Sequence, residues 1–262
     1  MVFTLSTIWA MQPSSPGATE AGASAAATDA APDHAAVELQ AVHARLEALA
    51  RGMSHDLRAP LRAIEGFAQQ VARDPAAPEA RAQLERIRQA AARMGGLIDG
   101  LVELMRIDGL PLRPGPVDLG LLAEWVAAEL QDAQPAPPLQ LEVQDGLGVT
   151  GDERLLKTLL QQVLRNARQF AGDGPARVEV GGEREGDTLR LRVRDHGIGF
   201  DMAHAGKLFQ PFQRLHGRDE GAGDGLGLAI AQRVAVRHGG GIAAEARPGE
   251  GATFHVVLRD LQ

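Results

Sequence analysis

Apolar residues between positions 46 and 105 recur every three or four residues, and this spacing constrains the fold more than any other feature of the chain. The first stripe consists of Leu46, Leu49, Met53, Leu57, Leu61, Ile64, Phe67 and Val71. The second stripe, after "RDPAAPEA", consists of Leu84, Ile87, Met94, Ile98, Leu101 and Met105. Because two prolines cannot sit inside a helix, the pattern predicts two helices joined by a short turn. Two helices alone bury little apolar surface, so we expect the hairpin to dimerise into a four-helix bundle.

The segment before the hairpin has a different composition. Residues 12–33 are rich in Ala, Ser, Pro, Gly and Thr and lack large apolar side chains. Burial cannot offset the entropy of ordering such a segment, so we expect a disordered leader over 1–36 and the hairpin over 37–108. The opening "MVFTLSTIWAM" lacks the basic residues of a secretory signal. The chain also lacks the ~20 consecutive apolar residues of a transmembrane helix.

A second domain is predicted after the Pro- and Gly-rich segment "GLPLRPGP", which we interpret as a linker over 109–116. Over 117–262, helical periodicity predicts helices in "VDLGLLAEWVAAEL", with Asp118 as N-cap, in "DERLLKTLLQQVLRNARQF" and in "GLGLAIAQRVAVRHG". Alternation predicts strands in "LQLEVQ", "ARVEVGGEREGDTLRLRVRD" and "GIAAEARPGEGATFHVVLRD". Helices mixed with mostly antiparallel strands indicate an α+β fold, here an α/β sandwich that follows the helical hairpin.

Composition excludes some functions. The formal net charge is -7, which argues against nucleic acid as a partner. Cysteine is absent, so disulfides and thiolate metal sites are excluded, and the composition fits a reducing, cytoplasmic location. The histidines show no spacing typical of a metal site.

A histidine interrupts the first stripe, in "MSHDLRAPL" (53–61). At about 100° per residue, His55 lies about 200° from both Met53 and Leu57, so it should point away from the apolar seam into solvent. Asp56 follows it, and Pro60 removes the amide that would bond to the carbonyl of Asp56, which predicts a bent helix. A neutral imidazole is nucleophilic near pH 7, and a carboxylate can hold one ring N–H while the other nitrogen attacks. Taken alone, the pair is more often a solvated surface dipeptide.

Three features of the second domain suggest a phosphate ligand. "DHGIGF" (195–200) places an acid and spaced glycines after an alternating strand, and "GAGDGLGLAI" (221–230) opens a helix, where backbone N–H groups favour anions. Asn166 is the single asparagine of the chain and lies inside a predicted helix, where asparagine is unfavourable. Its side-chain carbonyl suits Mg²⁺, which also binds substrate phosphates. The alternatives are turn glycines and a polar residue on a helix surface.

Together these motifs resemble the histidine kinases of two-component signalling, whose ATP-binding domain is of the gyrase–Hsp90–MutL, or Bergerat, type. The resemblance covers residue 37 to the C-terminus and keeps the family's order. "SHDLRAPL" matches the histidine box, "LLQQVLRNARQF" the asparagine box, "DHGIGF" and "GDGLGLAI" the two glycine boxes, and "LFQPFQR" the phenylalanine box. The stretch "FQRLHGRDEGAGDGLGLAI" further resembles the soluble, phytochrome-associated branch.

The resemblance implies an ATP:protein-L-histidine phosphotransferase that acts as a homodimer. His55 would be the phospho-acceptor and Asp56 the acid/base residue that activates it. The phosphoryl group would then pass to an aspartate of a response regulator receiver domain. Because no sensor-like domain precedes the first helix, the signal would come from elsewhere. The sequence leaves two routes open, a separate sensor protein that binds the hairpin or the helix before His55 acting as a docking coiled coil.

The resemblance also implies a site for ATP and Mg²⁺. Asn166 would coordinate Mg²⁺ and Asp195 would accept a hydrogen bond from the adenine amino group. Arg214 would lie at the base of a mobile ATP lid over 213–224. The nucleotide pocket and the floor under the phosphates would be formed by Gly197, Gly199, Gly223, Gly225, Leu226 and Gly227. His196, inside the first glycine box, is left outside the predicted site.

Three positions depart from the family's pattern. Gln162 stands where an asparagine is common, and Gln169 stands where a lysine is common, so phosphate binding should weaken unless Arg165 or Arg168 substitutes. Ala59 stands where members that also dephosphorylate their partner carry Thr or Asn, so we expect weak or absent phosphatase activity.

One alternative function stays open, and another is disfavoured. Gln162 and Gln169 favour a catalytically weak dimeric scaffold or phosphotransfer module with a degenerate ATP site. A gyrase- or chaperone-like ATPase is disfavoured, since it has no use for an exposed histidine on a separate helical hairpin.

Overall fold

A computed structural model of the chain describes residues 34–134, 136–213 and 225–262, with side chains from 52 onward except those of His55 and His204. The chain divides into two compact units, Met1–Ala44 and Arg45–Gln262. All contacts described below lie within the second unit. In the described part of the chain, no helix combines the length and the apolar character needed to cross a bilayer.

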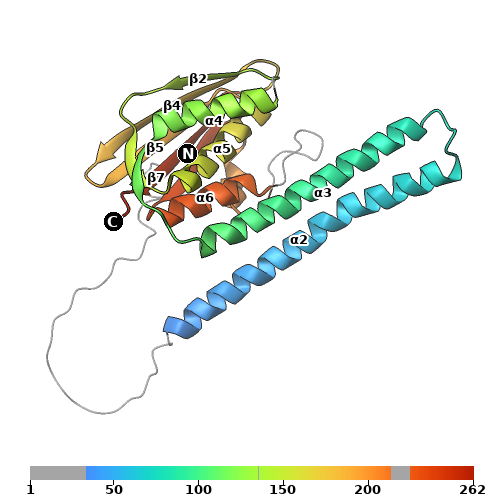
Figure 1. The fold of residues 1–262 in the computed structure, drawn as a ribbon, viewed down its shortest axis with the longest axis horizontal. Helices are drawn as coiled ribbons and strands as arrows, with labels where there is room; N and C mark the ends of the chain where they lie inside the picture. The colour runs from blue at the N-terminus through green and yellow to red at the C-terminus, as the bar shows by residue number, and fades with distance from the viewer. Residues whose placement is uncertain (1–33, 135, 214–224) are drawn as a thin grey trace, which may run out of the picture. The chain divides into compact units, whose positions relative to one another are not determined.

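The predicted helical hairpin is confirmed. Helix α2 spans His34–Arg73 and α3 spans Ala80–Gly109, with a short turn between them (Figure 1). The turn is held by Asp74, whose side chain accepts from the N–H of Ala76 at 3.2 Å. Helix α2 continues without a break through Pro60, which is buried.

The apolar stripes of the hairpin divide between two environments. On α3, the buried residues are Ala80, Ala90, Leu97, Leu104 and Ile107. Four residues of the predicted stripes are instead largely exposed in the single chain, namely Leu61, Leu84, Ile98 and Met105. The hairpin therefore has one apolar face covered within the chain and a second that is open.

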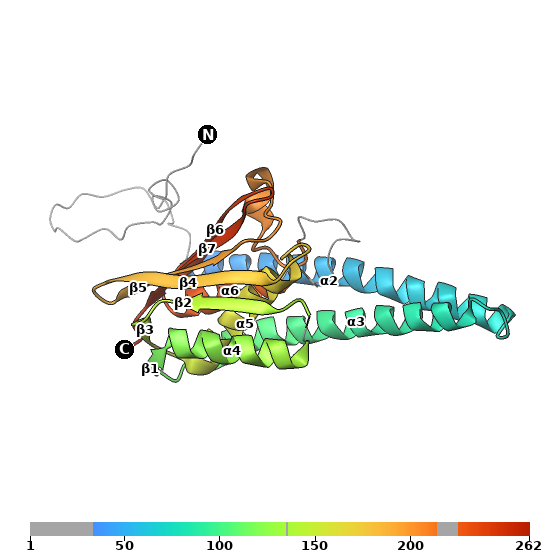
Figure 2. The same ribbon diagram turned by 90° about the horizontal axis from the view of Figure 1, so that it is seen from above.

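The second domain contains a five-stranded sheet in the order β2-β4-β5-β7-β6 (Figure 2). Its strands are β2 (Leu139–Val143), β4 (Ala176–Glu185), β5 (Thr188–Asp195), β6 (Gly241–Arg247) and β7 (Gly251–Arg259). Strand β2 pairs with β4 in parallel, and all other pairs are antiparallel. The predicted mostly antiparallel arrangement is confirmed.

Three helices cover one face of this sheet: α4 (Leu119–Ala133), α5 (Glu153–Gln169) and α6 (Gly227–Arg237) (Figures 1 and 2). Strand β5 shows why only one face is covered, because Leu191 and Val193 are buried while Arg192 and Arg194 between and beyond them are exposed. Asp118 caps α4 as predicted, accepting from the N–H of Gly120 at 2.9 Å.

Some elements were not predicted. Strands β1 (Gly115–Asp118) and β3 (Gly148–Gly151) form a separate antiparallel pair, and a 3₁₀ helix, η1, spans Met202–Lys207. These short segments are rich in Gly and Pro or lack a periodic pattern, so the sequence gives no strand or helix signal there. The bounds of α2 and β1 fall inside the predicted leader and linker, and the domain boundaries stay a prediction.

Candidate functional site

A cavity of about 930 Å³ lies in the second domain, bordered on one side by α3. Helix α5, the end of α4, the end of β5 and the start of α6 contribute its walls. Of the residues predicted for the nucleotide site, those that line the cavity are Asn166, Asp195, Gly199, Gly225, Leu226 and Gly227. The structure therefore brings together residues from three motifs that are up to 61 positions apart in the sequence.

Helix α5 turns its polar face to this cavity. Gln162, Arg165, Asn166 and Gln169 lie at positions i, i+3, i+4 and i+7, and all four line the cavity. The opposite face of the helix is buried in the core through Leu155, Leu156, Leu159, Leu160, Val163 and Leu164. This division explains why an asparagine is placed inside a helix: its half-buried side chain faces the cavity.

Asp195, at the end of β5, is 5% exposed. Its Oδ1 accepts from the N–H of Gly197 at 3.0 Å and from the N–H of Ala252 at 3.2 Å. Burial raises the pKa of Asp195 above its ordinary value, and these two hydrogen bonds only partly oppose that effect. Within the described residues its Oδ2 has no hydrogen-bond partner, so that oxygen can accept from a ligand in the cavity.

The glycines of the first glycine box serve close packing. A Cβ at Gly197 would clash with the carbonyl oxygen of Phe170, and a Cβ at Gly199, where φ is +60°, would clash with the carbonyl oxygen of Arg247. Gly197 does not line the cavity, and it acts on the site through its N–H to Asp195.

The second glycine box opens α6. Gly225 has a φ of +69°, and its carbonyl accepts from the N–H of Phe212 at 2.8 Å. Gly227 is the first residue of the helix, and a Cβ there would lie 2.9 Å from Oε1 of Gln162. The first N–H groups of a helix have no partner inside it and favour an anion. The predicted residues Arg214 and Gly223 lie outside the described residues.

The hairpin contacts the residues on both sides of the predicted lid. Leu226 packs on Gly100 of α3, where a Cβ would lie 2.9 Å from Cδ1 of the leucine. The ring of Phe212 packs on Gly52 of α2, where a Cβ would lie 2.5 Å from its Cδ2. Gly52 is three residues before His55, whose side chain lies outside the described part, and the following residue, Asp56, is half-buried.

The structure distinguishes the two arginines that could replace a lysine at Gln169. Arg168 is 6% exposed, and its guanidinium donates to the carbonyl oxygens of Leu130, Gln134 and Pro137. These hydrogen bonds fix the end of α4. Arg165 is exposed and lines the cavity.

His196 lies apart from the cavity. Its Nε2 is 2.7 Å from Oε1 of Glu179, and both side chains are on the exposed face of the sheet.

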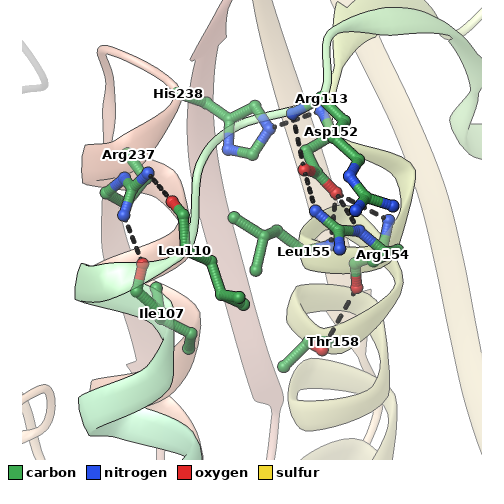
Figure 3. A network of polar contacts seen from close by, with 9 residues as sticks. All are labelled: Ile107, Leu110, Arg113, Asp152, Arg154, Leu155, Thr158, Arg237 and His238. Carbon is green, nitrogen blue, oxygen red and sulfur yellow. Dashed lines mark hydrogen bonds and ion pairs between the residues drawn. The ribbon is translucent and has the colours of Figure 1, made fainter.

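A buried polar network was not predicted (Figure 3). His238, fully buried at the end of α6, donates from Nδ1 to the carbonyl of Val234 at 2.9 Å, and its Nε2 accepts from the N–H of Asp152 at 3.1 Å. Burial lowers the pKa of His238, so the ring is neutral. Arg237 donates to the carbonyls of Ile107, Asp108 and Leu110, which ties the end of α3 to α6. In the sequence, the histidine that precedes three glycines at the end of the predicted helix was the available signal for this network.

Comparison with known families agrees with this geometry. Residues 45–110 match the His Kinase A (phospho-acceptor) domain, and residues 151–262 match the histidine kinase-, DNA gyrase B-, and HSP90-like ATPase. The chain belongs to the histidine kinases. The predicted family and the predicted fold class, a helical hairpin followed by an α/β ATPase domain, are thereby confirmed.

This histidine kinase chain is also similar to individual curated proteins. It is 30% identical over 223 residues to the phytochrome-like protein Cph1 of Synechocystis sp., covering 84% of this chain and 30% of Cph1. It is 30% identical over 234 residues to the sensor-like histidine kinase SenX3 of Mycobacterium tuberculosis, covering 85% of this chain and 57% of SenX3. The chain thus spans about a third to somewhat over half of the length of these relatives.

One solved structure shows the fold. Histidine kinase ThkA, in complex with response regulator protein TrrA, superimposes with a TM-score of 0.68 at 20% identity, covering 89% of this chain and 68% of ThkA.

Proposed function

We propose that this chain is an ATP-dependent protein-histidine kinase of a two-component system, an ATP:protein-L-histidine phosphotransferase. The observation that carries the proposal is the cavity that gathers Asn166, Asp195 and the start of α6 in a chain that also contains a phospho-acceptor hairpin. Phosphoryl transfer needs mainly positioning and neutralisation of charge, and these are what such a cavity can supply.

The nucleotide would be held at both of its ends. The free Oδ2 of Asp195 would accept from the adenine amino group, between apolar side chains that include Phe170 and Phe200. The phosphates would lie against the N–H groups at Gly225, Leu226 and Gly227, where the helix dipole favours negative charge. Arg214 and Gly223 belong to this proposal through their motifs alone.

The cavity also suits Mg²⁺. The described residues contain no cluster of three or more His, Asp or Glu side chains that could hold a metal. Asn166 provides one neutral oxygen, which fits an ion that takes most of its ligands from phosphates and water. When bound, Mg²⁺ would neutralise phosphate charge.

The proposed reaction uses His55 and Asp56 of α2. A ring nitrogen of His55 forms a bond to the γ-phosphorus, and the bond from that phosphorus to the β–γ bridging oxygen breaks, so ADP leaves with the electron pair. The proton on the other ring nitrogen passes to the carboxylate of Asp56. In the second step the P–N bond breaks as an aspartate of the receiver domain takes the phosphoryl group.

Further proposals concern assembly, location and phosphatase activity. The open apolar face of the hairpin supports a homodimer, and the complex of ThkA with TrrA supports a response regulator as partner. A separate sensor protein and a cytoplasmic location stay predictions from the sequence. Ala59, on α2, leads us to propose little phosphatase activity toward the phosphorylated partner.

The experiment is incubation with γ-labelled ATP and Mg²⁺. We expect acid-labile, alkali-stable label on the unaltered chain and none on His55→Ala, because only a phosphoramidate has this stability. The matched control is His196→Ala, which removes an imidazole outside the cavity and should keep the label. Label that persists in His55→Ala contradicts the acceptor, and no label on the unaltered chain favours the scaffold that Gln162 and Gln169 suggest.

A further inference from the structure

The cavity has few positive groups for a ligand as negative as a triphosphate. Its lining contains two arginines, Arg165 and Arg168, against three carboxylates, Asp99, Glu103 and Asp195. Gln169, which also lines the cavity, is neutral. Of the described lining residues, Arg165 and Arg168 are the ones that could neutralise phosphate charge.

Arg168 is not available for phosphate. Three backbone carbonyls, at Leu130, Gln134 and Pro137, accept from its guanidinium, and the side chain is nearly fully buried. Turning this guanidinium toward a ligand would leave three carbonyls at the end of α4 without their donor, at a cost comparable to the gain.

Arg165 is placed to take this role. It lies one turn after Gln162 and directly before Asn166, on the face of α5 that lines the cavity. Side chains of a helix lean toward its N-terminus, so the stem of Arg165 lies over the turn that contains Gln162. The side chain of Gln162 in turn abuts Gly227, the first residue of α6. Within the described residues, the guanidinium of Arg165 has no ion pair or hydrogen bond.

We propose that Arg165 is the phosphate-binding cation of this site and supplies the charge that Gln169 does not. The inference rests on the proposed nucleotide site and names a residue within it. Arg165 binds the β- or γ-phosphate of the nucleotide from the α5 side, opposite the N–H groups at the start of α6. The competing role is structural, in which Arg165 only balances the charges of Asp99 and Glu103 on α3.

The test is calorimetric binding of adenosine, Mg²⁺–ADP and Mg²⁺–ATP to the full chain and to Arg165→Ala. Loss of a charge-assisted hydrogen bond should weaken Mg²⁺–ATP binding about tenfold or more, with adenosine unchanged. The matched control is Arg177→Ala, which removes an exposed arginine of β4 outside the cavity and should bind all three ligands as before. Thermal unfolding without ligand checks that each variant is folded.

A rescue variant separates charge from structure. The double variant Arg165→Ala, Gln169→Lys returns a cation one turn away on the same face of α5, and we expect it to regain most of the lost Mg²⁺–ATP affinity. Unchanged Mg²⁺–ATP binding by Arg165→Ala, or an equal loss for adenosine, overturns the inference and leaves the proposed function standing. If the unaltered chain binds none of the three ligands, the proposed function fails and this inference fails with it.

Discussion

At the scale of single residues, the site depends on which polar side-chain atoms are already hydrogen-bonded to the backbone and which are left for a ligand. Asp195 has one oxygen engaged by two backbone N–H groups and one left for a ligand. Arg165 and Arg168 are three positions apart in one helix and both line the cavity, yet Arg165 is exposed and Arg168 is buried, donating to three backbone carbonyls. Residue type alone therefore does not tell which arginine can bind phosphate, because an arginine whose guanidinium already donates to backbone carbonyls is not available to a ligand.

The raised pKa of Asp195 gives a pH dependence of nucleotide binding. The carboxylate must be ionised to accept from adenine, and burial favours its protonated form. We expect the adenosine affinity of the unaltered chain to fall as the pH drops toward this raised pKa. Asp195→Asn should bind about tenfold or more weakly at neutral pH and should lose this pH dependence.

Binding titrations of adenosine across the acidic range measure this effect. Glu179→Gln is the control, because Glu179 is an acid on the exposed face of the sheet, paired with His196. An Asp195→Asn variant that keeps the full affinity, or the same acid response, would count against the assigned adenine contact.

At the scale of elements, the junction where α3, α5 and α6 meet is fixed by buried polar groups (Figure 3). Asp152 caps α5 and also accepts from the N–H of Arg113 at 2.9 Å, in the segment that follows α3. Burial acts to raise the pKa of Asp152, but the Arg154 guanidinium at 2.7 Å and the N–H groups of Arg113 and Leu155 hold it at about 2. The charged form of this carboxylate is thus part of the folded structure.

Asp152 should make the second domain sensitive to acid. Its pKa is depressed on folding, so its contribution is present above the ordinary pKa of 3.8 and is lost as the pH falls toward about 2. Asp152→Asn keeps a side chain that can cap the helix but removes the charge. We expect it to lower the free energy of unfolding by about 2 kcal/mol at neutral pH, with the difference shrinking below pH ~4.

Denaturant unfolding at several pH values measures this difference. Asp118→Asn is the matched control, because Asp118 caps α4 in an exposed position and should cost less. A variant difference that stays constant from neutral pH down to about 2 would show that charge is not what Asp152 contributes.

At the scale of the whole molecule, apolar side chains on the hairpin are left open in a single chain. Ile98 is 48% exposed and Met105 is 60% exposed, although both belong to the predicted apolar stripe of α3. They are seven residues apart, so they lie on one side of the helix, and Val102 between them is also exposed. Such an apolar surface favours association with a second copy.

The double variant Ile98→Asp, Met105→Asp should therefore shift the chain from dimer to monomer, because a four-helix bundle would have to bury four carboxylates. Analytical ultracentrifugation over a range of concentrations measures the association. Leu121→Asp is the control, since Leu121 is an exposed apolar residue of α4, outside the hairpin. A chain that is already monomeric, or a double variant that stays dimeric, contradicts the proposed bundle.

Much of the architecture follows from the sequence because local patterns carry it. The period of three to four residues predicts α2 and α3, and alternation predicts β4, β5, β6 and β7. Asp118 is a cap because its side chain bonds to backbone only two and three residues away. Short strands such as β1 and β3 escape prediction, since their pairing partner is about 30 residues distant.

The sequence by itself determined the family and the order of the motifs, and it pointed to six residues that line the cavity, because the ordered motifs together are far more specific than any one of them. Only the tertiary structure decided which arginine is free, that Gly197 acts through Asp195, and that His238 and Asp152 join three helices. These outcomes depend on carbonyls and N–H groups from segments remote in sequence. Burial makes each such group require a partner, and only the folded chain shows which partner it has.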